Sequence, residues 1–224
     1  MGLKIAIDGP AGAGKSTVAK KVAEKLGFVY IDTGAMYRAL TYKALSQGID
    51  LFDEDRLADL LNRHSIKLKI ESKQQKVYID DQEITEEIRD PIVTQNVSTV
   101  AAHAKVRTSM VEVQKALAKD GKIVMDGRDI GTHVLKDAEV KVFLTASIDE
   151  RAKRRFDELE KKGYQGSLEE IKNEIAIRDK KDEEREFAPL KKAEDAVLLD
   201  TTELTINQVV EEIIALAEIK MEEN

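Results

Sequence analysis

The segment Gly9-Pro10-Ala11-Gly12-Ala13-Gly14-Lys15-Ser16-Thr17 indicates both a fold class and a kind of ligand. It has the pattern G-x-x-x-x-G-K-[ST], the phosphate-binding P-loop. An apolar stretch at 3–8, typical of a buried strand, precedes it, and residues 16–26 carry apolar side chains at helical spacing. Because strand, loop and helix occur in the order that the motif requires, we interpret the segment as a working P-loop and not as a chance match in a turn rich in glycine and alanine.

The residue types of this loop suit a nucleotide polyphosphate. Glycines allow successive backbone N–H groups to point at phosphate oxygens, and the following helix presents its positive end to the same anion. The lysine of such a loop reaches the β- and γ-phosphates, and the hydroxyl after it reaches Mg²⁺. The sequence therefore predicts a nucleoside polyphosphate and Mg²⁺ as ligands, Ser16 as the metal ligand, and a nucleotide site made of Gly9, Gly12, Ala13, Gly14, Lys15, Ser16 and Thr17.

Composition narrows the class of protein. The 224 residues are 42% hydrophobic and 35% charged, which is typical of a folded globular chain. A net charge of −7 argues against nucleic-acid binding as the main role. The chain has no cysteine, which excludes disulfides, and its three histidines lie far apart in sequence, which argues against a zinc site. Without a membrane-spanning apolar run or a signal-peptide pattern, we expect a cytoplasmic protein with no membrane partner.

Short apolar segments alternate with helical stretches along the chain. Further strands are expected at 28–31, 122–125, 140–144 and 196–199. The alternation predicts a doubly wound α/β core with a five-stranded parallel sheet.

Two segments interrupt this alternation. Residues 66–70 and 77–80 alternate apolar and polar side chains around a turn expected at 72–76, which predicts an antiparallel hairpin within an insert at 63–90. Ser147 and Ser167 each precede a glutamate by three residues, the capping-box spacing, so we expect one helix from 147 and another from 167 to about 186. The predicted organisation is a core at 1–62, 91–146 and 167–224, the β insert at 63–90, and a separate unit at 147–166 that contains the first helix of this two-helix arm.

Polar side chains follow two of the predicted strands. Thr33 and Arg38 come after the second strand, and Asp126-Gly127-Arg128-Asp129 follows the third. Ligands of open α/β folds bind at the carboxyl ends of the strands, so these residues are candidates for a site facing the P-loop.

Several helical arginines have two interpretations. Arg178, Asp182 and Arg185 lie at i, i+4 and i+7 of the second arm helix and would share one face. By spacing alone a solvated salt-bridge ladder is favoured, and Arg151, Arg154 and Arg155 could equally form a basic surface. Beside a phosphate loop, however, arginines suit the binding of phosphoryl groups, because they bind bidentately and stay charged. Ser98 and Arg107, on helices expected at 91–103 and 105–119, would alone be ordinary surface residues.

Four segments together resemble bacterial cytidylate kinases. They are the P-loop, Asp32-Thr33-Gly34-Ala35-Met36-Tyr37-Arg38, Asp126-Gly127-Arg128-Asp129-Ile130-Gly131-Thr132 and Arg178-Asp179-Lys180-Lys181-Asp182. The resemblance covers essentially the whole chain. It implies a P-loop NTPase core with a nucleoside-monophosphate-binding insert and a mobile helical lid. It also implies an enzyme of pyrimidine metabolism that transfers the γ-phosphoryl group of ATP to CMP or dCMP.

The resemblance also implies roles for individual residues. It implies that cytosine and ribose are contacted by Thr33, Ser98, Arg107, Asp182 and Arg185. Phosphate ligands would be Arg38, Arg128 and Arg178, and the cations on the ATP side Lys15, Arg151 and Arg155. Asp129 matches an acidic residue at the acceptor site, so the implied catalytic set is Lys15, Arg128, Asp129, Arg151 and Arg155. Some relatives carry serine where this chain has Thr33, and some carry glycine where it has Ser16.

Three other functions remain to be weighed. A switch GTPase would need N-K-x-D and D-x-x-G elements, and neither occurs. Among P-loop kinases for other small acceptors, such as shikimate, AMP or UMP, a shikimate kinase would be smaller and lack the hairpin insert, and an adenylate kinase would differ at 126–132. A binding module with a degenerate nucleotide site would not be expected to keep Lys15 and Ser16. We therefore expect a monomeric kinase whose partners are small molecules, with no protein partner.

Overall fold

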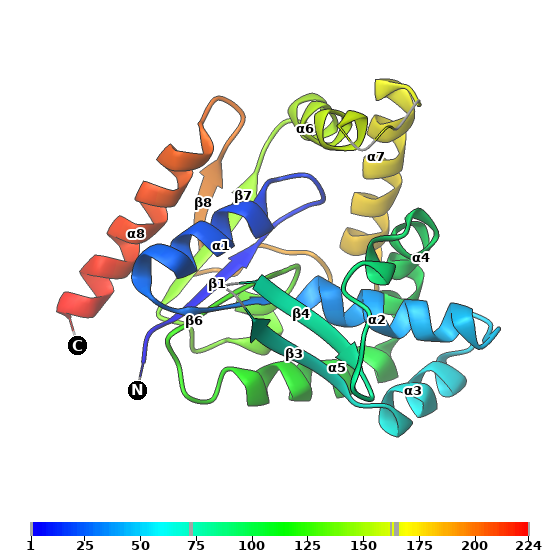
Figure 1. The fold of residues 1–224 in the computed structure, drawn as a ribbon. Coiled ribbons are helices and arrows are strands. Elements are labelled where there is room, and N and C mark those ends of the chain that lie inside the picture. The colour runs from blue at the N-terminus through cyan, green and yellow to red at the C-terminus, as the bar shows by residue number, and fades with distance from the viewer. Residues whose placement is uncertain (1, 72–73, 162, 164–165, 224) are drawn as a thin grey trace. The chain divides into compact units, whose positions relative to one another are not determined.

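The computed structural model describes residues 2–71, 74–161, 163 and 166–223 (Figure 1). The chain divides into two compact units. The P-loop unit comprises Met1–Tyr30, Asp120–Glu184 and Ala188–Asn224, and the hairpin unit comprises Ile31–Lys119 and Arg185–Phe187.

A five-stranded sheet carries the P-loop. Its order is β2-β6-β1-β7-β8, with β1 at Lys4–Asp8, β2 at Val29–Asp32, β6 at Ile123–Gly127, β7 at Val140–Thr145 and β8 at Val197–Asp200. Strand β1 pairs in parallel with β6 and β7, and β7 pairs in parallel with β8. The predicted five-stranded parallel sheet is confirmed. Because β1 lies in the middle, the loop after it emerges at the centre of the carboxyl edge, where α/β folds bind ligands.

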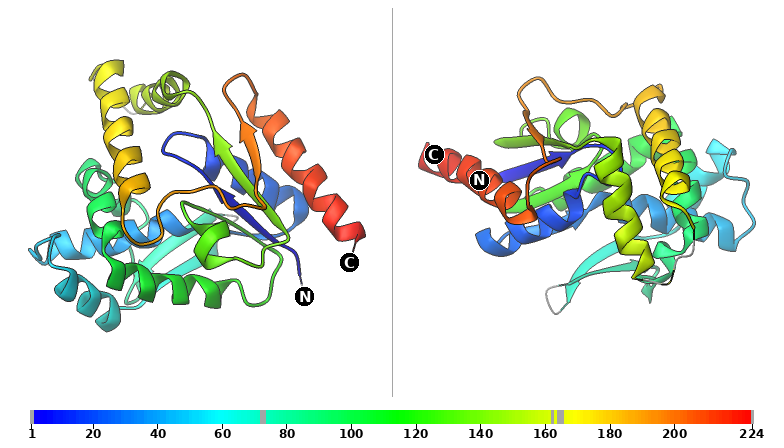
Figure 2. Two further views of the ribbon diagram at one scale, coloured as in Figure 1. Left: turned by 180° about the vertical axis from the view of Figure 1, so that it is seen from behind. Right: turned by 90° about the horizontal axis from the view of Figure 1, so that it is seen from above.

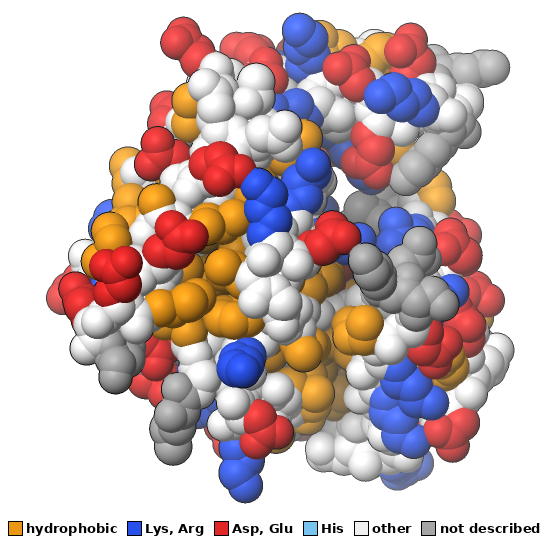
Figure 3. All heavy atoms as spheres, turned by 60° about the vertical axis from the view of Figure 1, so that its left-hand side comes forward, with side chains coloured by type: hydrophobic (Ala, Val, Ile, Leu, Met, Phe, Trp, Pro, Cys, Tyr) orange, Lys and Arg blue, Asp and Glu red, His pale blue; other side chains and the backbone are white. Residues whose placement is uncertain are grey.

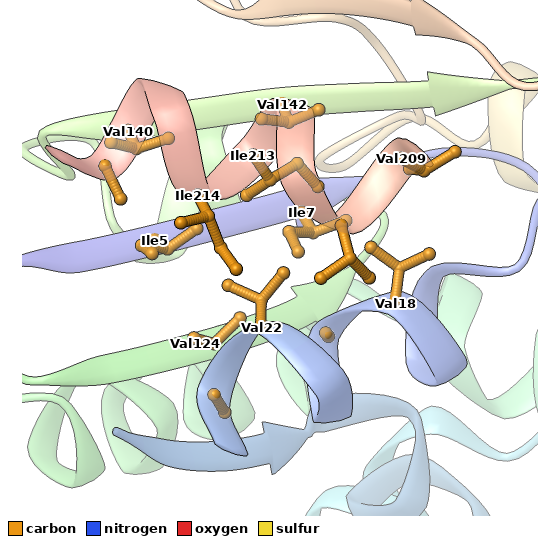
Figure 4. Close-up of a cluster of buried hydrophobic side chains, with 14 of the residues drawn as sticks. Ile5, Ile7, Val18, Val22, Val124, Val140, Val142, Val209, Ile213 and Ile214 are labelled. Atoms are coloured by element: carbon orange, nitrogen blue, oxygen red, sulfur yellow. The ribbon is translucent and has the colours of Figure 1, made fainter. Parts of the chain in front are cut away.

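Helices α1, at Lys15–Leu26, and α8, at Ile206–Glu222, pack on one face of this sheet (Figure 4). Val18 and Val22 of α1 meet Ile213 of α8 over Ile5 and other side chains of the sheet, in one buried cluster. Covering helices explain why the central strands are almost continuously apolar. Thr205 begins α8 with a full capping box to Gln208.

Hydrophobic side chains are exposed on β8 and on the outer side of α8. Figure 3 shows hydrophobic side chains next to acidic and basic ones on the side that it brings forward. The exposed hydrophobic residues of β8 and α8 are Val197, Leu198, Ile206, Ile219 and Met221, and exposed hydrophobic residues are common on folded proteins. In the part of the chain that the structure describes, no helix has the length and apolar character needed to cross a bilayer.

Two helices form the predicted arm after β7. Helix α6 at Ile148–Glu160 and helix α7 at Leu168–Glu184 lie side by side around Ala152, Ile171 and Ile175 (Figure 2). Ser147 caps α6 by accepting from the Glu150 N–H at 3.2 Å. The predicted end of α7 at about 186 is wrong by two residues. Ahead of Pro189 the chain turns, and the Leu190 N–H donates to the Asp182 carbonyl at 2.8 Å.

The hairpin unit combines four helices with a small sheet. The helices are α2 at Thr33–Ser46, α3 at Glu54–Arg63, α4 at Pro91–Ala102 and α5 at Ala104–Leu117, and their shared core includes Met36, Leu40, Leu57, Val97 and Met110. A short 3₁₀ turn, η1 at Glu87–Arg89, precedes α4.

The antiparallel hairpin of this unit is confirmed. Strand β3 at Ile66–Glu71 pairs with β4 at Gln74–Ile79, so the alternating pattern was correctly interpreted. The turn expected at 72–76 is shorter than predicted, because residues 74–76 belong to β4, while 72–73 lie outside the described residues. A third strand, β5 at Gln82–Glu83, was not predicted, since two polar, exposed residues carry no alternation.

Candidate active site

The P-loop glycines stand where other residues would not fit. Gly9 has a φ of 150°, and a Cβ there would lie 2.1 Å from the Leu144 carbonyl oxygen. Gly12 has a φ of 76°, and a Cβ there would lie 3.0 Å from the Cβ of Arg151. Both a left-handed backbone and close neighbours therefore require glycine at these positions.

The first turn of α1 is open to an anion. Its N-cap residue, Gly14, provides no side-chain hydrogen bond to the helix. The N–H groups at the start of a helix lack partners within the helix, so an anion there gains both hydrogen bonds and the favourable end of the helix dipole. This geometry fits the phosphate role predicted for the loop.

Lys15 is a buried cation beside the loop. Its Nζ donates to the Pro10 carbonyl at 2.7 Å. Burial holds the pKa of Lys15 well below its usual range, and the charges of Arg128 and Arg178 lower that pKa further, while Asp126 and Asp8 oppose them. Three cations thus share a small region of the P-loop unit, and a bound polyanion would reduce the repulsion among them.

Asp126, at the end of β6, holds the hydroxyl predicted to bind the metal. Its Oδ2 accepts from Ser16 Oγ at 2.8 Å, and its Oδ1 accepts from Tyr30 Oη at 2.7 Å. Hydroxyl and carboxylate oxygens are the hard donors that Mg²⁺ prefers, and Mg²⁺ usually takes its other ligands from water and phosphate. Accordingly, the residues fit Mg²⁺ even though the described residues contain no cluster of three or more acidic, histidine or cysteine side chains able to hold a metal.

Asp8, the last residue of β1, ties the P-loop strand to the segment after β6. Its two carboxylate oxygens accept from the N–H groups of Ile130 and Gly131, both at 2.8 Å. These groups begin a single helical turn, η2 at Ile130–Val134, that follows Asp129. Burial raises the pKa of Asp8 to about 6, helped by the charge of Asp129 and opposed by the two N–H groups and by Lys15.

This raised pKa predicts an unusual pH dependence of stability. The folded chain holds the Asp8 proton more tightly than the unfolded chain, in which the pKa of this carboxyl lies near its ordinary value of 3.8. The resulting stabilisation is complete below the unfolded pKa and is lost as the pH rises through about 6. The free energy of unfolding of the wild type, relative to that of Asp8→Asn, should therefore fall across this window in urea denaturation.

Asp137→Asn provides a control of opposite sign. Lys4 holds the pKa of Asp137 below its usual range, so that carboxylate stabilises the fold above its unfolded pKa and loses this effect in acid. If the difference between wild type and Asp8→Asn instead rises with pH, the N–H groups and Lys15 outweigh burial, and the raised pKa of Asp8 is wrong.

Arg128 pairs with Asp182 of α7. The Arg128 Nε donates to Asp182 Oδ2 at 2.8 Å, and both side chains are largely buried. Burial opposes the charge on Arg128, but the carboxylates of Asp182, Asp179 and Asp126 together raise its pKa. Arg128 therefore remains a cation at the sheet edge, in a setting where a second anion could join it.

The arm contributes two further predicted cations, in different environments. Arg151 is buried against the P-loop, where its Nη1 donates to the Ala11 carbonyl at 3.0 Å. Arg155, one turn along α6, is more exposed and pairs with Glu158 of its own helix at 2.9 Å. Lys15, Ser16, Arg128, Asp129, Arg151, Arg178 and Asp182 are thus brought together in the P-loop unit, whereas the structure pairs Arg155 with its own helix.

In the hairpin unit, Asp32 organises the start of α2. Its Oδ1 caps the helix by accepting from the Ala35 N–H at 2.9 Å, and its Oδ2 accepts from Arg38 Nη2 at 2.7 Å. A Cβ on Gly34 would lie 3.0 Å from Arg38 Nη1, so glycine leaves room for the guanidinium. Thr33 is buried in the first turn of the same helix.

The other predicted acceptor residues of this unit are buried polar side chains. Ser98 lies on α4, Arg107 on α5, and Arg185 just after α7. The Arg107 guanidinium lies over the Tyr37 ring, with 5.2 Å from its Cζ to the ring centroid, and its Nη1 donates to the Ala101 carbonyl at 2.9 Å. The structure corrects one detail: Arg185 follows the last residue of α7, so it does not extend the helical face of Arg178 and Asp182.

Sequence reasoning assigned no role to two carboxylates that organise the P-loop unit. Asp8 ends a buried strand, and Asp179 is buried on α7. A charged residue at the end of an apolar strand singled out Asp126 as a candidate and could equally have singled out Asp8. Asp179 has no such signal, because its partners lie more than 25 residues away in the sequence.

Comparison with known proteins identifies the family. A family model described as cytidylate kinase matches residues 5–219. The cytidylate kinase of Lysinibacillus sphaericus (strain C3-41) is 57% identical over 219 residues, 98% of each chain. That of Bacillus subtilis (strain 168) is 55% identical over 218 residues, 97% of each chain.

Among solved structures, a gluconokinase from Sinorhizobium meliloti 1021 matches with a TM-score of 0.50 and 16% identity, covering 98% of this chain and 94% of its own. At that identity the likeness concerns the fold alone. The family model and the two relatives cover nearly the whole chain, and the chain belongs to the cytidylate kinase family.

Proposed function

We propose that this protein transfers the γ-phosphoryl group of ATP to CMP or dCMP and so forms the corresponding diphosphate. The observation that carries the proposal is that Lys15 lies close to two arginines, Arg128 and Arg178, whose charges lower the pKa of Lys15. Phosphoryl transfer between two polyanions needs cations of this kind more than it needs a nucleophile or a strong base. Membership of the cytidylate kinase family supports cytidine nucleotides as acceptors.

Each predicted site residue of the P-loop unit has a role in this reaction. The attacking atom is a phosphate oxygen that is already largely ionised at neutral pH. The protein therefore acts mainly by positioning the two phosphate groups and neutralising their negative charge. The N–H groups of the loop and Lys15 would hold the ATP phosphates, with Arg151 and Arg155 as further cations on the ATP side. Arg128 and Arg178 would hold the acceptor phosphate near Asp129.

Mg²⁺ is the proposed metal cofactor. Ser16 would bind it, and Asp126, which accepts from the Ser16 hydroxyl at 2.8 Å, would orient that hydroxyl. When bound, the ion would neutralise charge on the transferring phosphates. The protein would supply hard oxygen atoms in a fixed position, and Tyr30 helps to fix them by donating to the Asp126 carboxylate.

The hairpin unit is the proposed reader of the nucleoside. Thr33, Ser98, Arg107 and Arg185 would contact cytosine and ribose, Arg38 would contact phosphate, and Asp182 of the P-loop unit would accept from the cytosine amine. Buried polar side chains suit this role, because a ligand that fails to satisfy them is rejected strongly. The insert at 63–90 would be the monophosphate-binding segment, and 147–166 the lid.

We further propose that the enzyme acts as a cytoplasmic monomer. The proposal assigns one full set of ATP and acceptor residues to each copy of the chain, so an isolated copy should be active. Size-exclusion chromatography at assay concentration tests this directly. An active dimer that loses specific activity on dilution would contradict it.

A panel of monophosphates tests the proposed reaction. In an assay coupled to ADP formation, CMP and dCMP should give turnover with ATP and Mg²⁺, while AMP, GMP and shikimate should give none above background. Tight GTP binding without monophosphate-dependent turnover would favour a GTPase instead. Turnover with AMP in place of CMP would assign a different acceptor.

A further inference from the structure

Two arm side chains hold both backbone groups of Ala11 at the tip of the P-loop. The Ala11 N–H donates to Asp179 Oδ1 at 3.1 Å, and the Ala11 carbonyl accepts from Arg151 Nη1 at 3.0 Å. Asp179 lies on α7 and Arg151 on α6, and each is only 8% exposed. One residue of the loop is therefore fixed on both sides by buried charged groups.

Arg151 and Asp179 also bind each other. The Nη1 of Arg151 donates to Asp179 Oδ2, and its Nε donates to the Ala146 carbonyl at 3.0 Å. Gly12 packs against the backbone of Arg151, since a Cβ there would lie 3.0 Å from the Arg151 carbonyl oxygen. Arm and loop thus form a closed set of contacts around the Ala11 peptide groups.

This arrangement favours one orientation of the Ala11 peptide groups in a loop whose residue types allow several. Pro10 and three glycines within 9–14 leave few side chains to pack, and glycine has the widest choice of backbone conformations. A loop that is ordered before its ligand arrives binds more tightly, because less conformational entropy is lost on binding. Both oxygens of Asp179 are used for this, one on the loop and one on Arg151.

We propose that Asp179 is a positioning residue for the nucleotide, which acts through Arg151 and the Ala11 backbone to hold the P-loop in its phosphate-binding conformation. Its carboxylate takes the Ala11 N–H, so the groups left for phosphate are those of the residues that follow. This proposal rests on the proposed function in taking ATP as the ligand of the loop. It assigns to Asp179 its main effect on the nucleotide side and no contact with the acceptor.

Asp179→Asn separates the two contacts. The amide oxygen can still accept from the Ala11 N–H, but the amide nitrogen cannot accept from Arg151. We expect the dissociation constant of the fluorescent analogue mant-ADP, measured without acceptor, to rise about tenfold. The KM for ATP should rise about as much, while the KM for CMP should change less than about twofold. Glu174→Gln, an exposed change of the same charge on α7, should leave all three values unchanged.

Arg151→Lys provides a second variant that keeps the buried positive charge. A lysine has one nitrogen in place of the separate Nε and Nη1 that Arg151 uses for Ala146 on one side and for Ala11 and Asp179 on the other, so mant-ADP binding should again weaken. The double variant Arg151→Lys, Asp179→Asn should bind no worse than the weaker single variant, because both changes break one connection. Full additivity would mean that the two residues act independently and would overturn the proposal.

Two further outcomes decide between positioning and structure. If the variants lose only thermal stability and bind mant-ADP like the wild type, the pair is structural. If the KM for CMP rises in place of the KM for ATP, Asp179 serves the acceptor. Failure of the proposed function is distinguishable from both, because wild-type protein that binds mant-ADP but does not phosphorylate CMP leaves the binding comparison intact.

Discussion

Replacing Lys15 with alanine should lower kcat by about a hundredfold or more, the range seen when one group that stabilises transition-state charge is removed. Lys15 lies among Arg128 and Arg178, and burial together with these charges depresses its pKa. Burial and repulsion disfavour the charged form of Lys15 in the free protein. Its attraction to the nucleotide is strongest when negative charge develops on the bridging and transferring phosphate oxygens. Its loss is therefore felt in the transition state more than in ground-state binding.

The fold should survive this substitution. Burial and neighbouring cations disfavour charged Lys15 in the folded state, so removing the ammonium group relieves repulsion, and we expect the melting temperature to be kept or raised. Lys21→Ala, an exposed change on the same helix, is the matched control and should retain kcat. A folded Lys15→Ala protein with nearly normal turnover would disprove the role of the P-loop in catalysis.

Much of the fold could be predicted because its signals are local. The P-loop pattern, the apolar strands and the capping residues Ser147 and Ser167 each depend on neighbours within a few positions. The parallel sheet then follows, since strands alternating with helices have few ways to bury both faces. Strand β5 and the end of α7 were missed because they depend on packing and on the turn before Pro189.

The candidate site was predicted less completely, for a physical reason. Residue types beside a phosphate loop suggested its cations, but the carboxylates that fix them depend on contacts distant in sequence. Asp8 reaches Ile130, and Asp179 reaches Ala11, across more than a hundred residues. No rule based on the spacing of residues along the sequence predicts such a contact. Spacing can also mislead in the opposite direction. Arg155 lies one turn after Arg151 on α6, yet it pairs with Glu158 of its own helix.

Asp182 is the residue on which the proposed choice of base depends. It is buried on α7, and its Oδ2 accepts from Arg128 Nε at 2.8 Å. Cytosine presents an amine where uracil presents a carbonyl, so a carboxylate here would attract the first base and repel the second. Rejection is strong because a buried carboxylate that faces an oxygen loses its hydrogen bond and keeps its desolvation cost.

We therefore expect Asp182→Asn to lower kcat/KM for CMP by about 1–3 kcal/mol, or about 5- to 150-fold, the range for a buried hydrogen bond to a charged group. An amide can donate to the uracil carbonyl and carries no charge, so kcat/KM for UMP should fall less, and the ratio of the CMP value to the UMP value should decrease. Glu183→Gln, a change at an exposed neighbour on α7, should leave kcat/KM unchanged for both substrates.

The ratio isolates base reading from the other contact of Asp182. Weakening its pair with Arg128 would disturb the phosphate side of the acceptor, which CMP and UMP share, and would lower both values of kcat/KM equally. Only a contact with the base changes their quotient. If Asp182→Asn slows both substrates and leaves the ratio as it is in the wild type, Asp182 serves to position Arg128, and the base is read by residues of the hairpin unit.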